Sequence, residues 1–352
     1  MIPRVLISFW EKTRPLYLPL SWGYALGMRL RRRAYEKGLR SRRHPGIFSV
    51  VVGNLSLGGE GKTPITLALA EFLHALGLRP VVILRGYGGR ARGPLVVSEG
   101  CGPLVAPGVS GDEAWLCALR LCGVPVVVGR DRLQAADLAR KRFSPGVILF
   151  DDAFQHLALR ADLYLLVVSA GRDPFRERLF PAGRLREPVS VARRASAVLI
   201  SRANLFPERA HELARKFAAL GLPVFTVPFE AGPLIRLLGG SLRPLSERRP
   251  RRVFAFCGIG EPRGFLRLLE ERGMEVCGFE AFPDHHFYGP AELEALTRRA
   301  LRCRAEALIT TEKDLVRVPA SDSGLPVLAL SLLVRLPGDL LAWLRQRLPQ
   351  GE

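Results

Sequence analysis

An apolar strand, a glycine-rich loop and a helix follow one another between residues 47 and 76, and this succession constrains the fold more than any other feature of the chain. Residues 47–54 are apolar, rich in valine and end in Gly-Asn, as a buried strand does. Residues 64–76 place apolar side chains at helical spacing, and Gly77 closes that helix. A strand, a tight loop and a helix joined in this way are typical of a parallel sheet covered by helices.

The loop has a composition that suits phosphate binding. Its residues are Gly58, Gly59, Glu60, Gly61, Lys62 and Thr63, followed by Pro64. Glycines let backbone N–H groups face a phosphate, and the helix N-terminus adds partial positive charge. In P-loop proteins the lysine reaches the β- and γ-phosphates and the hydroxyl holds Mg²⁺, so we expect Lys62 and Thr63 to do this with ATP. The general pattern has glycine where this chain has Ser56, and an ordinary glycine turn before a helix is the alternative interpretation.

Strands and helices alternate along most of the chain. We expect further strands at 80–84, 124–128, 147–150, 163–168, 197–200, 253–256 and 307–310, helices at 110–121, 132–142 and 262–271, and a hairpin of 234–238 and 241–245 around Gly239-Gly240. The expected fold is therefore α/β. A P-loop NTPase-like domain with a parallel sheet (46–228) is joined by a short β-hairpin linker (229–249) to a smaller C-terminal α/β domain (250–352).

Two adjacent acids, Asp151 and Asp152, follow the apolar strand at 147–150. A carboxylate at the end of such a strand commonly holds Mg²⁺ in P-loop enzymes. Neighbouring strand residues point to opposite faces, so the pattern leaves open which of the two does so.

Three further polar clusters are candidates for function. Gly111-Asp112-Glu113 opens a helix, where Asp112 is alternatively an N-cap. Pro283-Asp284-His285-His286 is alternatively a surface loop or a metal site, although no matched Cys/His pair supports zinc. Arg184-Leu185-Arg186-Glu187-Pro188 offers guanidinium groups to a phosphorylated ligand or forms a solvated turn.

The positive charge of the chain is concentrated at its N-terminus. The net charge is +19, and residues 1–45 hold eleven Lys and Arg against two acids, a local net of +9. A basic end suits nucleic acid or an anionic membrane. The uncharged stretch from Pro15 to Met28 is shorter than the roughly 20 residues that span a bilayer, so it lies in a membrane interface or packs on the protein's own core. The six cysteines show no C-x-x-C pair, which indicates free thiols.

Nine short motifs in order resemble the tetraacyldisaccharide 4′-kinase family, the lipid A 4′-kinases of Gram-negative bacteria. They are Val52-Gly53-Asn54-Leu55, Gly58-Gly59-Glu60-Gly61-Lys62-Thr63-Pro64, Arg85-Gly86-Tyr87-Gly88, Gly111-Asp112-Glu113, Asp151-Asp152-Ala153-Phe154-Gln155-His156, Pro181-Ala182-Gly183-Arg184-Leu185-Arg186-Glu187-Pro188, Phe256-Cys257-Gly258-Ile259-Gly260, Phe282-Pro283-Asp284-His285-His286 and Thr311-Glu312-Lys313-Asp314. The serine at position 56 is normal for that family, whereas Ala153 replaces its usual glycine and puts the local turn in question.

The resemblance implies transfer of the ATP γ-phosphate, with Mg²⁺, to the 4′-hydroxyl of a tetraacylated glucosamine disaccharide 1-phosphate, which forms lipid IVA. Asp112 matches the family's proposed general base and His285 its partner, so closure of two domains would complete the site. Asp151 and Asp152 match its metal-binding and catalytic carboxylates. The remaining matches to substrate-binding or active-site motifs are Asn54, Arg85, Tyr87, Gln155, His156, Arg186 and Glu187.

The resemblance also favours a membrane role for the N-terminus. A lipid substrate stays in the bilayer, so residues 1–45 are expected to be an amphipathic, basic segment on the anionic cytoplasmic face of the bacterial inner membrane, peripheral or monotopic. No nucleic-acid partner and no obligate protein partner is expected. The alternative function is a P-loop GTPase or ATPase of the metallochaperone type that acts on a protein partner.

Overall fold

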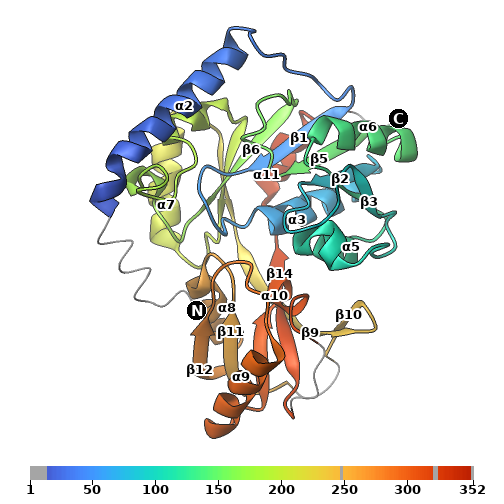
Figure 1. Cartoon of the computed structure of the whole chain (residues 1–352), viewed down its shortest axis with the longest axis vertical. Coiled ribbons are helices and arrows are strands. Elements are labelled where there is room, and N and C mark those ends of the chain that lie inside the picture. The colour runs from blue at the N-terminus through green and yellow to red at the C-terminus, as the bar shows by residue number, and fades with distance from the viewer. Residues whose placement is uncertain (1–13, 246–248, 320–323, 350–352) are drawn as a thin grey trace. The chain divides into compact units, whose positions relative to one another are not determined.

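The computed structural model describes residues 14–245, 249–319 and 324–349. The chain forms two compact units. The larger contains the described residues up to Pro228 and those from Arg335 onward, and the smaller runs from Phe229 to Val334 (Figure 1). Each is an α/β unit built on its own sheet, as expected.

The larger unit is built on an eight-stranded sheet in which only the first edge strand is antiparallel to its neighbour. Its strands, in the order in which they lie side by side, are β3 (Leu95–Ser98), β4 (Val126–Val128), β2 (Pro80–Leu84), β5 (Val147–Asp151), β1 (Phe48–Gly53), β6 (Leu163–Ser169), β7 (Ala197–Ser201) and β8 (Val224–Val227). Central strands such as β5 and β2 are buried along their whole length, which explains their continuous apolar sequences.

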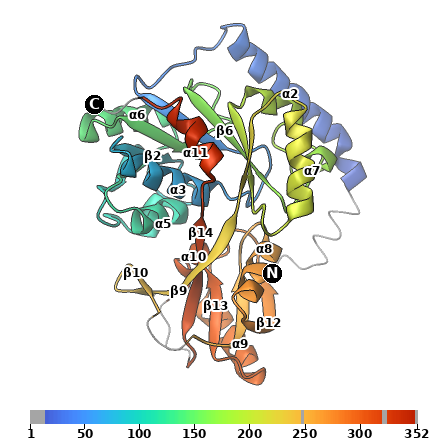
Figure 2. The same cartoon turned by 180° about the vertical axis from the view of Figure 1, so that it is seen from behind.

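Helices cover both faces of this sheet (Figures 1 and 2). The helices of this unit are η1 (Arg14–Tyr17), α2 (Leu18–Glu36), α3 (Lys62–Ala75), α4 (Pro107–Ser110), α5 (Asp112–Arg120), α6 (Arg132–Phe143), η2 (Pro174–Arg176), η3 (Val189–Arg194), α7 (Pro207–Ala218) and α11 (Gly338–Arg345). Helices α6 and α7 share one apolar core with alternate residues of the strands, such as Ile148 and Phe150. Helix α3 contacts β1, β2, β5 and α5 and is absent from that core, so it covers the other face.

The parallel strands end at one edge of the sheet, and this edge carries the polar motifs. Val52 of β1 pairs with Asp151 of β5, and Ser169 of β6 pairs with Ser201 of β7. The glycine-rich loop begins just after β1. Residues from distant parts of the sequence therefore meet around the loop.

The smaller unit contains a six-stranded mixed sheet. Its strands in spatial order are β10 (Ser241–Pro244), β9 (Phe229–Leu238), β14 (Val327–Val334), β13 (Ala307–Thr311), β11 (Arg252–Cys257) and β12 (Glu275–Ala281), and its helices are α8 (Pro262–Glu271), α9 (Pro290–Arg302) and α10 (Glu312–Leu315). Strands β14, β13, β11 and β12 are parallel, whereas β9 runs antiparallel to both its neighbours.

The expected division into domains differs from the structure in two respects. The hairpin exists, with Leu238 opposite Ser241. However, it is not a separate linker, because β9 also pairs with β14 and is an integral strand of the smaller sheet. The C-terminal residues from Arg335 belong to the larger unit, where Trp343 of α11 packs on Phe225 at a ring distance of 5.7 Å.

The N-terminal segment is a helix with two different faces. One face packs on the larger unit, where the Ser21 hydroxyl accepts from the Ala182 N–H and donates to the Leu179 carbonyl, and where Tyr24 contacts the Phe180 ring edge to face. The other face exposes apolar side chains, namely Leu16, Leu20, Trp22, Leu26 and Leu30. Residues 1–13 of the expected membrane segment lie outside the described part of the chain. Within that part, no helix is both long and apolar enough to cross a bilayer.

Candidate active site

The glycine-rich loop leads directly into α3. Gly61 is the N-cap of this helix and has a left-handed backbone (φ 87°), which glycine adopts without strain. Lys62 and Thr63 are the first two helical residues, and Pro64 lies in the first turn, where its missing N–H has no helical partner to lose. The local sequence therefore places a lysine, a hydroxyl and unpaired N–H groups at one helix N-terminus.

Asp151 is bound to α3 by two hydroxyl groups. Thr63 Oγ1 donates to one carboxylate oxygen at 3.0 Å and Thr66 Oγ1 donates to the other at 3.2 Å. The side chain of Arg132, buried at the start of α6, donates to the Asp151 carbonyl at 3.3 Å. Asp151 is itself 2% exposed, so its carboxylate is held rigidly beneath the loop.

Asp152 faces a different set of partners. Lys62 Nζ lies 3.4 Å from Asp152 Oδ1, and the Arg186 guanidinium donates to both carboxylate oxygens at 3.1 and 3.2 Å. Asp152 has a left-handed backbone (φ 51°), an uncommon conformation that is enriched at functional sites. The residue in question at this turn, Ala153, has no positive φ and so fits without strain.

The two acids have opposite electrostatic environments. Burial, followed by the nearby charge of Glu113, raises the pKa of Asp151 to about 6. Burial would also raise the pKa of Asp152, but the positive charges of Lys62 and Arg186 outweigh it and hold that pKa at about 2. The structure thus distinguishes Asp151 from Asp152, whereas the sequence pattern treats the two acids alike. Asp152 is compensated by two cations, whereas Asp151 is a buried carboxylate with excess negative charge around it.

A hydrogen-bond network extends from Asp152 along the expected substrate residues. Arg186 donates to Gln155 Oε1 at 3.4 Å, and Gln155 Nε2 donates to the Asn54 carbonyl at 2.7 Å and to Glu187 at 3.3 Å. The buried Asn54 donates in turn to the Ser56 carbonyl. His156 is half-buried next to this network, and burial followed by Arg132 lowers its pKa.

Glu60, expected in the nucleotide-binding loop, forms three hydrogen bonds within the protein. Its carboxylate accepts from the Ser56 hydroxyl at 2.6 Å and from the Ser169 N–H at the end of β6, and its carbonyl accepts from the Ser201 hydroxyl at 2.6 Å. It is 5% exposed. Glu60 thus ties the loop to two strand ends with its carboxylate turned inward.

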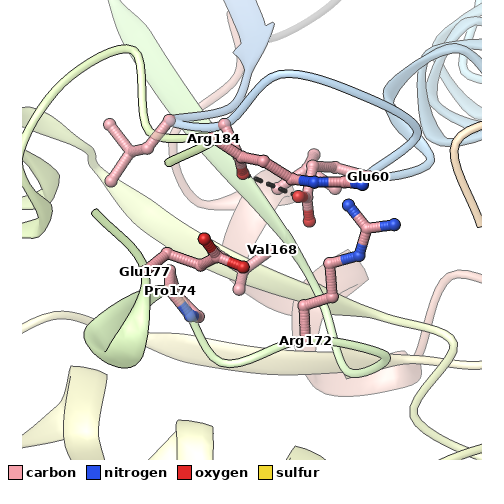
Figure 3. A pocket seen from close by; sticks show the side chains of 9 residues that line it. Glu60, Val168, Arg172, Pro174, Glu177 and Arg184 are labelled. Atoms are coloured by element: carbon pink, nitrogen blue, oxygen red, sulfur yellow. Dashed lines mark hydrogen bonds between the residues drawn. The ribbon is translucent and has the colours of Figure 1, made fainter. Parts of the chain in front are cut away.

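A small pocket lies beside the loop, with Ser56, Glu60, Arg172 and Arg184 among the residues that line it. Figure 3 shows the side chains of Arg172 and Arg184 extending toward Glu60 in this pocket, with Glu177 opposite. A Cβ atom on Gly58 would lie 3.9 and 4.0 Å from these two guanidinium groups. These are ordinary contact distances, so the left-handed backbone of Gly58 (φ 105°), and not a lack of space, favours glycine at this position.

Asp112 is the first residue of α5, and Gly111, not Asp112, is the N-cap. The side chain of Asp112 is 6% exposed. Gly111 has φ 84°, and a Cβ atom there would lie 2.3 Å from the Tyr87 carbonyl, whereas one on Gly88 would lie 3.7 Å from Asp112 Oδ1. The loop that carries the exposed Arg85 and Tyr87 therefore packs against the helix end that carries Asp112.

His285 belongs to the smaller unit, where two basic side chains flank its ring and only one of them can donate to the neutral imidazole. Lys313 Nζ lies 3.2 Å from Nε2, and Arg317 lies 3.2 Å from Nδ1. Lys313 also pairs with Asp284 at 3.2 Å. His286 instead pairs with Glu292 at 3.0 Å and stacks on Phe282, so the two adjacent histidines have separate surroundings.

Comparison with known proteins supplies the family. A family model described as tetraacyldisaccharide-1-P 4′-kinase matches residues 13–349. The tetraacyldisaccharide 4′-kinases of Desulfatibacillum aliphaticivorans and Syntrophus aciditrophicus are 37% and 36% identical to the chain over 320 and 325 residues, which cover 88% and 89% of this chain and 85% and 87% of theirs. The chain belongs to the tetraacyldisaccharide 4′-kinase family.

A solved structure of the same family agrees with this assignment. The crystal structure of LpxK from Aquifex aeolicus in complex with ATP is 31% identical in sequence and superposes with a TM-score of 0.75, over 96% of this chain and 99% of that one. The tetraacyldisaccharide 4′-kinase family thus accounts for the fold, and the chain is an ATP-dependent kinase. The relatives named here are kinases, and nothing in them supports the metallochaperone alternative.

Several residues of the site are missing from the sequence expectations. Thr66 lies one helical turn after Thr63, so helical spacing could have indicated that both reach Asp151. Arg132 follows the carboxyl end of β4, the same sheet edge as Asp151. Lys313 stands inside one of the nine motifs, whereas nothing local to Arg317 indicates its contact with His285.

Proposed function

We propose that this kinase transfers the γ-phosphate of ATP to the 4′-hydroxyl of a tetraacylated glucosamine disaccharide 1-phosphate, a lipid A precursor, to give lipid IVA. One observation carries the proposal. In a chain of this family, Lys62 and Thr63 stand at the N-terminus of α3 and contact Asp152 and Asp151. The arrangement joins a phosphate-binding helix end to two carboxylates in different electrostatic states.

Mg²⁺ fits the donors at this point. It prefers oxygen ligands and is commonly held by one or two carboxylates together with substrate phosphates. Thr63 and Asp151 offer such oxygens, and Asp152 is the adjacent acid. Within the described part of the chain, no three His, Cys, Asp or Glu side chains cluster to hold a metal by themselves, which suits an ion shared with the nucleotide. When bound, Mg²⁺ would neutralise phosphate charge, and the buried Asp151 would be relieved of its uncompensated charge.

Lys62 and Arg186 are the cations available to the phosphates. A lysine at a P-loop helix start is aimed at the β- and γ-phosphates, and Lys62 lies 3.4 Å from Asp152. Asp152 thus fixes the position of the Lys62 ammonium at the start of α3. Arg186, whose planar fork suits phosphate oxygens, is assigned to a phosphate of the nucleotide or of the lipid, and Gln155 and Asp152 fix its orientation.

Asp112 is assigned as the general base for the attacking hydroxyl. Its carboxylate lies at a helix N-terminus, whose partial positive charge stabilises an anion. His285 is assigned as its functional partner, with Lys313 and Arg317 fixing the ring.

The base and its partner are tested by Asp112→Asn, by His285→Asn and by the double variant. Asparagine is chosen at position 285 because the backbone there is left-handed (φ 63°), which Asn tolerates. If Asp112 and His285 act together, the double variant should lose no more turnover than the less active of the two single variants. Additive losses would contradict the pairing, and the matched control is Asp137→Asn on α6, where the Asp137 side chain is 46% exposed and pairs only with Arg140 of the same helix among the ion pairs described.

The exposed face of α2 is proposed to lie on the anionic cytoplasmic face of the inner membrane. Trp22 is 70% exposed, and Leu26 and Leu30 follow at intervals of one helical turn. Exposed arginines 29, 31 and 33 lie on the same helix. Apolar side chains with basic neighbours bind anionic interfaces. Trp22→Ser/Leu26→Ser should weaken binding to anionic vesicles, whereas Leu104→Ser, another exposed leucine, should not.

The reaction is tested by acceptor-dependent formation of ADP in mixed micelles. The wild-type kinase should form ADP only when the disaccharide 1-phosphate is present. Lys62→Ala should abolish this activity, and Lys141→Ala, at an exposed position of α6, should leave it intact. ADP formation at the same rate without acceptor would refute the proposal.

A further inference from the structure

We propose that Cys101 and Cys122 form a dithiol site that closes to an intramolecular disulfide by exchange with a low-molecular-weight disulfide such as oxidised glutathione. Twenty residues separate Cys101 from Cys122 in the sequence, and both cysteines lie outside every motif discussed above. The inference does not depend on the proposed kinase chemistry.

The backbone places the two cysteines directly opposite each other. Cys101 and Cys122 are partners in an isolated antiparallel bridge. The neighbouring pair is hydrogen-bonded, since the Gly123 N–H donates to the Gly100 carbonyl at 2.8 Å. Hydrogen-bonded and non-hydrogen-bonded pairs alternate along an antiparallel ladder, so the two cysteines occupy a non-hydrogen-bonded position.

This type of position suits a disulfide. In non-hydrogen-bonded pairs the Cα atoms are about 4.5 Å apart and both side chains project from the same face. Disulfides require Cα separations of about 4.4–6.8 Å. The bond can therefore form by side-chain rotation, without movement of the backbone.

Both thiols are also accessible to a reagent. Cys101 and Cys122 are exposed, whereas Cys117 and Cys257 are buried. Cys277 and Cys303 form a second neighbouring pair, but burial, followed by the hydrogen bond with Cys303, raises the pKa of Cys277 to about 11. Because the thiolate is the species that attacks, this second pair should react more slowly and serves as an internal comparison.

The chemistry balances in two exchanges. One thiolate attacks the sulfur of the oxidised reagent, which forms a mixed disulfide and releases one reduced thiol. The second cysteine loses its proton and attacks the protein sulfur of the mixed disulfide, which expels the second reduced thiol. The two cysteines are oxidised by two electrons and the reagent is reduced by two.

The bond would close a loop that contains α4 and all of α5. This segment begins after β3 and carries Asp112 at the start of α5. Cytosolic disulfides are usually transient and redox-responsive. Oxidation would therefore join the two ends of the segment that carries the candidate base, Asp112.

The test treats the full-length protein with oxidised glutathione under native conditions, quenches with acid, alkylates the remaining thiols and measures intact mass and peptide links. The wild type should lose two of its six thiols, retain no glutathione and yield a peptide that joins Cys101 to Cys122. Cys101→Ser should instead keep glutathione on Cys122, because no partner remains to expel it. Cys277→Ser should behave like the wild type.

Three results would overturn the proposal. They are stable glutathione on both Cys101 and Cys122 of the wild type, a link between Cys277 and Cys303 in place of the expected one, and six alkylatable thiols after treatment.

Discussion

Replacing Asp151 by Asn should stabilise the metal-free and nucleotide-free protein at neutral pH. Asp151 is 2% exposed, and its pKa is raised to about 6 by burial and by Glu113, compared with about 3.9 for an unfolded aspartate. A folded-state pKa above the unfolded value means that the folded protein binds the proton more tightly. The stability that this provides is present below about pH 4 and is lost as the pH rises through about 6.

The size of the effect follows from the same shift. Two pKa units correspond to about 3 kcal/mol. Asn carries no charge, and its amide can still form hydrogen bonds with the hydroxyls of Thr63 and Thr66. Asp151→Asn should therefore raise the free energy of unfolding by up to about 3 kcal/mol at pH 7.5, and the gain should vanish near pH 4. The same variant should lose kinase turnover, a common consequence of stabilising an active site.

The measurement is urea unfolding from pH 4 to pH 8 in the presence of a chelator. Asp152→Asn is the matched control. Lys62 and Arg186 hold the pKa of Asp152 low despite its burial, so its charge stabilises the fold at neutral pH. Its removal should therefore destabilise the protein at pH 7.5 by about 1–2 kcal/mol after allowance for partial exposure. An Asp151→Asn protein less stable than the wild type at pH 7.5, or a difference that does not change with pH, would refute the reasoning.

Two further predictions concern the loop and the substrate residues. Glu60→Gln should lower the free energy of unfolding by about 2 kcal/mol and weaken ATP binding, because an amide NH₂ would face the Ser169 N–H or the Ser56 hydroxyl. Urea unfolding measures the stability and calorimetric titration measures the ATP affinity, with Glu71→Gln on the exposed side of α3 as the control. An unchanged ATP affinity would count against a role of Glu60 in shaping the loop. Arg186→Ala should raise KM for ATP or for the lipid, whichever carries the phosphate that Arg186 binds, while Arg193→Ala at an exposed position should raise neither. Steady-state kinetics with each substrate varied in turn shows which KM changes. An unchanged KM for both substrates would mean that Arg186 does not belong to the binding site.

The sequence predicts the central sheet of the larger unit well because burial on both faces leaves continuous apolar strands. The apolar residues of β5 show this directly. The expected ends of the predicted strands of this sheet lie within two residues of the observed ends. Both edge strands, β3 and β8, were missed, since they are short and only partly buried.

The arrangement of distant segments could not be derived locally. Gly239-Gly240 indicates a hairpin, but pairing of β9 with β14 joins residues about a hundred positions apart. The contact of α11 with the larger unit is likewise a tertiary effect, in which Trp343 meets Phe225 and Arg345 lies over Phe72. A sequence pattern predicts that such an element is present, but not which element it pairs with or packs against.

For the candidate site, too, the sequence indicates the residues but not their contacts. The motif identifies Lys62, Thr63, Asp151 and Asp152, but only geometry pairs Thr63 with Asp151 and Lys62 with Asp152. The inward turn of Glu60 was also missed, because its partners Ser169 and Ser201 belong to strands more than a hundred residues away. Local spacing indicates which residues gather at the candidate site, and the packing of the sheet fixes which of them are in contact.

The most direct test of the proposed reaction is transfer of label from ATP labelled in its γ-phosphate to the tetraacylated disaccharide 1-phosphate, with phosphorus NMR to locate the new phosphate. The wild-type kinase should place the label on the 4′-hydroxyl, and Lys62→Ala should transfer none. Label released as inorganic phosphate while the disaccharide stays unlabelled, or label at another hydroxyl, would contradict the account.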